Sequence, residues 1–174
     1  MKKKILILVL LLSLTGCMKK EFTFNDVKDY MFVKDNKENI EKIVLKTNTA
    51  LGEKCYLLNT DEAYNLLENI TIVEETTEHT TDSDFYVMVH FNENIKRKYY
   101  FEKRRLYEEK IVKTFWFEGT NLVHSGKKYK LEKEPIFFTN KNEIPEDIDK
   151  ENNHIIVAER EIQCEVLKRV VREY

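Results

Sequence analysis

The segment Phe85–Phe91 places the strongest constraint on the fold of this chain. Its odd-numbered positions are Phe or Val, whereas its even-numbered positions are Tyr, Met and His. Successive side chains of a strand point to opposite faces of a sheet, so this alternation predicts a strand with one buried face. The 174 residues include only four Gly and two Pro. Asn and Asp, which tolerate unusual backbone angles, must therefore make most of the turns.

Shorter stretches with the same period of two predict further strands. Asn92–Asn94 is expected to turn the chain, so that residues 95–101 pair with 85–91 as a hairpin. A polar stretch over 139–153 is expected to form a loop or a short helical turn. The other predicted strands are 42–46, 54–58, 71–78, 111–117, 122–124 and 129–131.

Apolar residues at helical spacing occur in two places. Asn59 fits a helix N-cap and Glu62 completes a capping box, so residues 60–69 are expected to form a helix. From about Ala158 the spacing is that of a C-terminal amphipathic helix, although 155–157 would equally fit a strand. The predicted fold class is α+β: an antiparallel sheet of meanders and hairpins, with one inserted helix near 60–69 and a C-terminal amphipathic helix.

The first 17 residues differ in character from the rest of the chain. Three lysines precede an apolar run over residues 5–12, which Leu14-Thr15-Gly16-Cys17 closes after one serine. A bilayer span needs about 20 apolar residues, so this run is too short, and its layout is that of a secretory signal peptide. The closing motif resembles the lipobox of bacterial lipoproteins. The alternatives are a plain secreted protein and an uncleaved single-pass anchor.

The lipoprotein resemblance implies cleavage after Gly16 and a diacylglyceryl group joined to Cys17 by a thioether. Two acyl chains would hold the protein at the outer face of the cell membrane. The resemblance therefore implies that the lipid bilayer is one of its partners. Residues 1–16 are then the signal peptide, 17–21 the lipidated cysteine with a short tether, and 22–174 a single extracytoplasmic domain. In residue usage that domain resembles small lipoproteins of Gram-positive bacteria, which implies no particular active residues.

The net charge of the expected mature chain excludes one class of partner. Loss of residues 1–16 removes three lysines, which leaves 26 basic and 31 acidic side chains and a net charge of −5. A general nucleic-acid binder carries an excess of basic side chains, so no nucleic-acid partner is expected.

Two small groups of residues are candidate sites for cross-linking or metal binding. Cys55 and Cys164 could form a disulfide in an exported protein, or each could be a separately buried thiol. His79, Asp82 and Asp84 could share one cation, since they bring two carboxylates and an imidazole together. They lack the glycine and further oxygen ligands of a calcium loop and the spacing of a zinc site. A polar hairpin loop is the preferred interpretation, and no cofactor is predicted.

A dense group of basic residues, interleaved with aromatic ones, follows Asn94. Such a group can seat a protein on anionic lipid or on an envelope polymer. The preferred interpretation is an exposed sheet edge whose charges prevent strand-to-strand aggregation. The basic residues are Lys96, Arg97, Lys98, Lys103, Arg104 and Arg105.

The sequence contains no Gly-rich phosphate loop, no helix with paired His and no Gly-x-Ser-x-Gly elbow. It therefore favours a non-catalytic, membrane-anchored binding module that acts on an envelope protein or peptide. The alternative is a small surface hydrolase or a metal-binding protein centred on the His79 group. A binding module is expected to present an aromatic patch. The candidate patch residues are Tyr86, Met88, Tyr100 and Trp116. For Trp116, which stands between Phe115 and Phe117, packing in the core is the preferred interpretation.

Overall fold

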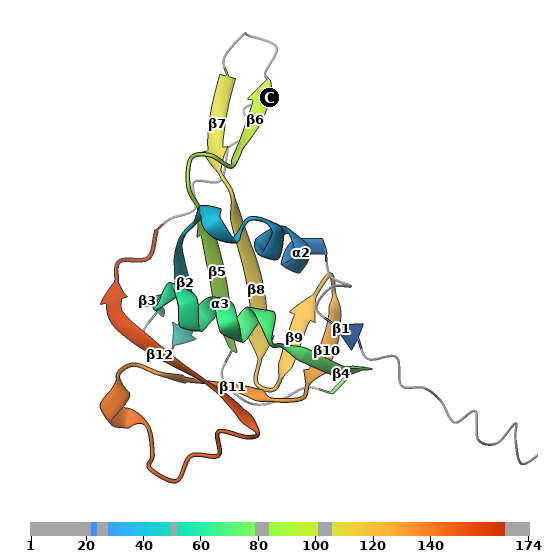
Figure 1. Cartoon of the computed structure of the whole chain (residues 1–174), viewed down its shortest axis with the longest axis vertical. Coiled ribbons are helices and arrows are strands. Elements are labelled where there is room, and N and C mark those ends of the chain that lie inside the picture. The colour runs from blue at the N-terminus through green and yellow to red at the C-terminus, as the bar shows by residue number, and fades with distance from the viewer. Residues whose placement is uncertain (1–21, 24–27, 50–51, 79–83, 101–105, 166–174) are drawn as a thin grey trace, which may run out of the picture.

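The computed structural model describes residues 22–23, 28–49, 52–78, 84–100 and 106–165. Ten described strands form one large sheet, and two more form a separate ribbon that projects from the body (Figure 1). The sheet strands are β1 (Phe22–Thr23), β2 (Ile40–Thr49), β3 (Gly52–Leu58), β4 (Thr71–Thr76), β5 (Asp84–Phe91), β8 (Val112–Glu118), β9 (Asn121–His124), β10 (Lys127–Leu131), β11 (Glu134–Phe138) and β12 (Asn153–Ile162). The ribbon strands are β6 (Lys96–Tyr100) and β7 (Leu106–Lys110).

The large sheet is mixed rather than purely antiparallel. Its strands follow the order β1-β4-β10-β9-β8-β5-β2-β3-β12-β11. Only β11 and β12 run parallel, and the other neighbouring pairs are antiparallel. The predicted strand Phe85–Phe91 is confirmed as β5, which lies between β2 and β8 near the middle of the sheet.

The fold is mainly β, so the prediction of an α+β fold with a C-terminal amphipathic helix is wrong. Residues 158–162, expected to begin that helix, belong to β12, in which Ile156 and Ala158 are buried. The strand pairs with β3 on one side and with β11 on the other. These long-range ladders override the helical spacing of a short segment. The rest of the predicted helix, 166–174, lies outside the described residues.

The predicted hairpin between residues 85–91 and 95–101 is also wrong. Both edges of β5 are occupied, by β2 and β8, so no edge of β5 is left for the chain that follows it. That following segment forms β6, which pairs with β7 in the separate ribbon. The turn itself is present, since the Asn92 side chain accepts a 3.0 Å hydrogen bond from the backbone N–H of Asn94.

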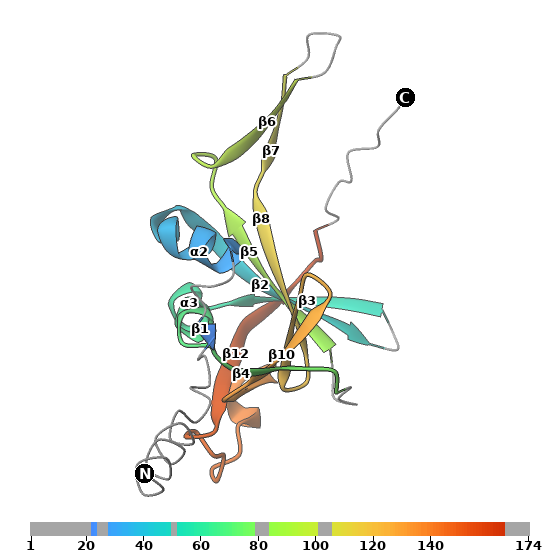
Figure 2. The same cartoon turned by 90° about the vertical axis from the view of Figure 1, so that its right-hand side faces the viewer.

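Two α-helices lie on one side of the central strands (Figure 2). The predicted helix is confirmed as α3 (Thr60–Glu68), and the oxygen of its N-cap, Asn59, accepts 3.1 Å hydrogen bonds from two backbone N–H groups. Sequence analysis missed the other helix, α2 (Lys28–Asp35). Short 3₁₀ helices are present at Lys37–Asn39 and, within the predicted polar loop, at Lys141–Glu143.

The two faces of the sheet are built differently. We call the face against α2 and α3 the covered face; the opposite, open face carries no helix in the described part of the chain. The covered face holds the main core, which includes the four Phe and Val residues of β5 and, on β8, both Phe115 and Phe117. The smaller cluster of Val44, Cys55 and Met88 lies on the open face.

Candidate binding surfaces

An aromatic pair occupies the middle of the open face. Tyr86 on β5 lies directly opposite Trp116 on β8, and the two rings stack with centroids 6.0 Å apart. Both side chains are half-buried, whereas Thr114 on the same face is exposed. A cross-strand aromatic pair of this kind stabilises the sheet and also offers apolar area to a partner.

Charged and polar groups lie at one end of this aromatic pair. Asp84 on β5 is directly opposite Glu118 on β8, and Lys128 Nζ contacts Glu118 Oε2 at 2.6 Å. Burial, followed by the Glu118 carboxylate, raises the pKa of Asp84, and the Lys128 ammonium opposes that rise. Asn121 is buried there, and its Nδ2 has no hydrogen-bond partner among the described residues. This end of the open face is therefore polar and crowded.

The other end of the open face is closed by the last described residues. Cys164 forms a disulfide with Cys55 on β3, and Glu165 forms an ion pair with Lys42 on β2. Together with Ile162, the disulfide packs over the apolar cluster that contains Val44 and Met88. Sequence analysis left open whether Cys55 and Cys164 are paired or are separate thiols. In the structure they form a disulfide.

His90 lies beside this closure and is buried, with 5% of its surface exposed. Burial, followed by the Lys42 ammonium, lowers the pKa of His90. Glu165 and Glu41 favour its charged form, and Lys110 disfavours it. The neutral imidazole is therefore the form that this site holds.

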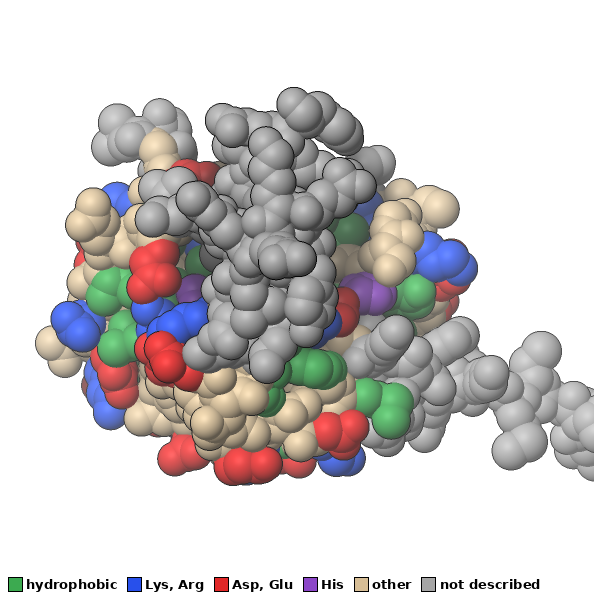
Figure 3. All heavy atoms as spheres, turned by 90° about the horizontal axis from the view of Figure 1, so that it is seen from above, with side chains coloured by type: hydrophobic (Ala, Val, Ile, Leu, Met, Phe, Trp, Pro, Cys, Tyr) green, Lys and Arg blue, Asp and Glu red, His purple; other side chains and the backbone are tan. Residues whose placement is uncertain are grey.

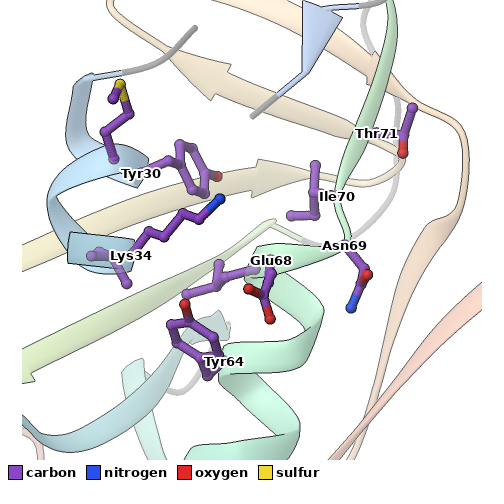
Figure 4. A pocket seen from close by; sticks show the side chains of 10 residues that line it. Tyr30, Lys34, Tyr64, Glu68, Asn69, Ile70 and Thr71 are labelled. Atoms are coloured by element: carbon purple, nitrogen blue, oxygen red, sulfur yellow. The ribbon is translucent and has the colours of Figure 1, made fainter. Parts of the chain in front are cut away.

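A cleft lies between the two helices on the covered side (Figure 4). Its volume is about 290 Å³, and Tyr30, Val33, Leu67 and Ile70, all buried, form its apolar lining. In Figure 4 the Lys34 side chain extends into the space between Tyr30 and Glu68. The remaining lining residues are Met31, Tyr64, Asn69 and Thr71.

Two details of this cleft bear on what it could bind. Met31 is 47% exposed, and no other large hydrophobic side chain is exposed among those whose burial the structure describes. Tyr64 lies beneath Lys37, whose Nζ is 4.1 Å from the ring centroid. Burial, followed by the Glu68 carboxylate, raises the pKa of Tyr64. The cleft thus combines an apolar lining with charged side chains of both signs at its mouth.

Only one of the three candidate metal ligands lies among the described residues. His79 and Asp82 lie outside the described residues, and Asp84 faces Glu118 and Lys128. Within the described ranges no three His, Cys, Asp or Glu side chains are placed to hold a metal ion.

Only half of the predicted basic group lies among the described residues. Lys96, Arg97 and Lys98 belong to β6, whereas 103–105 lie outside the described residues. The register of the ribbon places Arg97 opposite Glu109 and Lys98 opposite Glu108. Seen along the ribbon in Figure 3, the surrounding surface mixes basic and acidic side chains rather than forming a patch of one sign.

The predicted aromatic patch is only partly present. Tyr86, Met88 and Trp116 do share one face, but Met88 is buried at 7% exposure. Tyr100 belongs to β6 in the separate ribbon. Sequence analysis also expected Trp116 to pack in the core like its neighbours, whereas alternation places it on the open face, opposite to Phe115 and Phe117.

Sequence analysis missed the helix-side cleft because it missed α2. The available signal was the spacing of Tyr30 and Val33, one helical turn apart in a segment of only eight residues.

The combination of these features defines a mainly β protein with a mixed sheet, one face of which is covered by helices while a disulfide covers only one end of the other face. No protein-family model, no curated protein and no solved structure matches this chain. None of the described helices is both long enough and apolar enough to cross a membrane.

Proposed function

We propose that this protein is a lipoprotein of the bacterial cell envelope, anchored through a diacylglyceryl group on Cys17. Its folded body is a non-catalytic module that binds an envelope protein or peptide at the outer face of the cell membrane. The support for the anchor is the lipobox Leu14-Thr15-Gly16-Cys17.

One structural observation carries the proposal. The first described strand, β1, begins at Phe22 and pairs with β4, so the fold starts five residues after Cys17. At about 3.3–3.6 Å per residue, five residues span at most roughly 18 Å, less than the width of a small domain. The body is therefore held against the bilayer, where partners at the membrane surface are within its reach. The disulfide between Cys55 and Cys164 also suits an oxidising compartment outside the cytoplasm.

The open face is the surface that we assign to the partner. The helices and β1 lie on the same side of the central strands (Figure 2), so the anchored side of the body is the helical side. The open face then points away from the bilayer, with the Tyr86–Trp116 pair near its middle. Aromatic side chains of this kind carry much of the binding energy in protein interfaces.

Anchoring is tested by growing cells with an alkyne analogue of palmitate. The wild-type chain is expected to take up the label, and Cys17→Ala is expected to lose it, because the acyl groups are attached through that residue. Cys55→Ala is the matched control and should keep the label. An unlabelled wild-type chain would contradict the anchor.

Binding is tested with a photo-reactive phenylalanine at Thr114, an exposed position on the open face. Irradiation of living cells should give one dominant adduct with an envelope protein, and the adduct should disappear when Trp116 is changed to Ser. The probe at Glu159, an exposed position on β12, is the control. No reproducible protein adduct at position 114 would exclude this face as the partner surface.

A further inference from the structure

We infer that the cleft between α2 and α3 receives an acyl chain of a phospholipid from the membrane in which the protein is anchored. This inference rests on the proposed anchor at Cys17. It assigns to the helical side of the body a ligand of its own, separate from the partner of the open face.

The chemistry of the cleft suits one end of an amphiphile. Its lining side chains Tyr30, Val33, Leu67 and Ile70 are buried and predominantly apolar, while Met31 is exposed beside them. Small-molecule sites are concave and mostly apolar with a few polar groups at their edge, and this cleft has that form, with the Met31 side chain extending its apolar surface toward solvent. The volume of about 290 Å³ suits one chain, or part of one, with the headgroup left outside.

The position of the cleft relative to the anchor selects the ligand. Thr71 lines the cleft and is also the register partner of Thr23 on β1. The cleft therefore adjoins β1, the strand with which the described fold begins. Phe22, the first residue of β1, is only five residues after Cys17. An anchored molecule keeps this cleft beside the lipid, where acyl chains far outnumber any other apolar ligand.

The charges at the mouth of the cleft are consistent with a headgroup outside it. Lys34 is exposed and forms no ion pair with another described residue. A lysine at the membrane surface is attracted to the phosphate of a phospholipid. Glu68 and Asn69, on the other side of the mouth, add polar groups that belong at the interface rather than in hydrocarbon.

The test uses the full-length protein purified from membranes, with a photo-reactive phenylalanine at Met31 or, as a control, at Thr114. Each protein is reconstituted into vesicles of phosphatidylglycerol and phosphatidylethanolamine and irradiated, and lipid adducts are measured by mass spectrometry. Burial of only two methylene groups of an acyl chain in the cleft favours the bound over the unbound lipid by roughly tenfold. Adducts at position 31 are therefore expected to exceed those at 114 by about tenfold or more.

A second variant tests the charge at the mouth. With the probe at position 31, Lys34→Glu is expected to lower the adduct yield by about fivefold or more, since the loss of one basic side chain near an anionic surface alone has about a fivefold effect. Lys130→Glu, an exposed lysine on the open face, is the matched control and should leave the yield unchanged.

The lipid on Cys17 is measured in the same sample. If Cys17 carries its lipid and position 31 shows no excess over 114, the inference fails while the anchor stands. If Cys17 carries no lipid, the anchor and the inference fail together. Adducts at position 31 that contain an envelope protein instead of lipid, when the probe is used in living cells, would also overturn the inference.

Discussion

The covered and open faces of the sheet use neighbouring residues of the same strands in opposite ways. On β2, Ile43 and Leu45 are fully buried under the helices, while Val44 between them packs beneath the disulfide. On β8, Phe117 is fully buried, while Trp116 is half-buried and Thr114 is exposed. The covered face holds the main core beneath the two helices, whereas the open face is covered only where the last described residues cross it.

This difference suggests a division of roles within one sheet: the covered face stabilises the fold, and the open face is available for binding. The large buried aromatic and aliphatic area of the covered face supplies most of the hydrophobic free energy of folding. The open face depends on one covalent link and on local ion pairs, such as that between Lys46 and Glu53. A face that contributes less to folding has more residues available for binding.

The largest expected effect is the loss of a ring from the covered face. Phe117→Ala removes a fully buried side chain that stacks on Phe85 with centroids 5.0 Å apart. We expect the free energy of unfolding to fall by about 3–5 kcal/mol, as measured by urea denaturation. Thr114→Ala on the open face should change it by less than about 0.5 kcal/mol. Similar losses for the two variants would show that the faces do not differ as described.

The next effect tests the closure of the open face. Cys55 and Cys164 are 109 residues apart, and loss of a native disulfide of this kind costs about 2–5 kcal/mol. The double variant to Ala should show that loss in urea denaturation, and the wild type with a reductant should match it. A double variant as stable as the oxidised wild type would mean that the link is not formed in solution.

A smaller effect is expected from His90 as the pH falls. Its pKa is lowered in the folded state, so the unfolded chain binds the proton at higher pH. The free energy of unfolding should therefore fall as the pH drops below 6.5, the ordinary histidine value, by at most about 1.4 kcal/mol per unit. His154, whose pKa is also lowered by burial, contributes to the same slope. His90→Gln should therefore reduce the slope, and His124→Gln should leave it unchanged. Measurements above pH 5 avoid the Glu165 carboxylate, whose pKa is lowered by Lys42.

The smallest effect concerns the helix that covers the sheet. Asn59→Ala removes the oxygen that accepts from the N–H groups of Asp61 and Glu62, so we expect a loss of about 1 kcal/mol in thermal or urea unfolding. Asn65→Ala, at an exposed position within α3, is the control and should be neutral or slightly stabilising, because Ala favours helix. Equal effects of both variants would argue against the cap.

Local pattern predicted some of these elements well. The alternation of Phe85–Phe91 and the cap at Asn59 depend only on nearby residues, and the structure has a strand and a helix at those places. The strand β11 was not predicted because Pro135 lacks an N–H group. It is tolerated there because β11 is an edge strand of the sheet.

The candidate surfaces were less predictable than the elements. The cleft needs α2 beside α3, and the open face needs Tyr86 opposite Trp116, thirty positions further along the chain. Neither of these long-range contacts produces a recognisable pattern among neighbouring residues of the sequence. The disulfide is a similar case, since an even number of cysteines permits a pair but does not require it.

Periodicity and capping are properties of nearby residues, so the amino-acid sequence was sufficient to predict the alternating strand β5 and the helix α3. The proposed anchor likewise rests on adjacent residues alone, those of the motif that ends at Cys17. The partners of β5, the ribbon of β6 and β7, and the strand character of β12 were set by the folded whole. The physical reason is that backbone hydrogen bonds between strands and burial against distant side chains outweigh the weak local preference of a short segment.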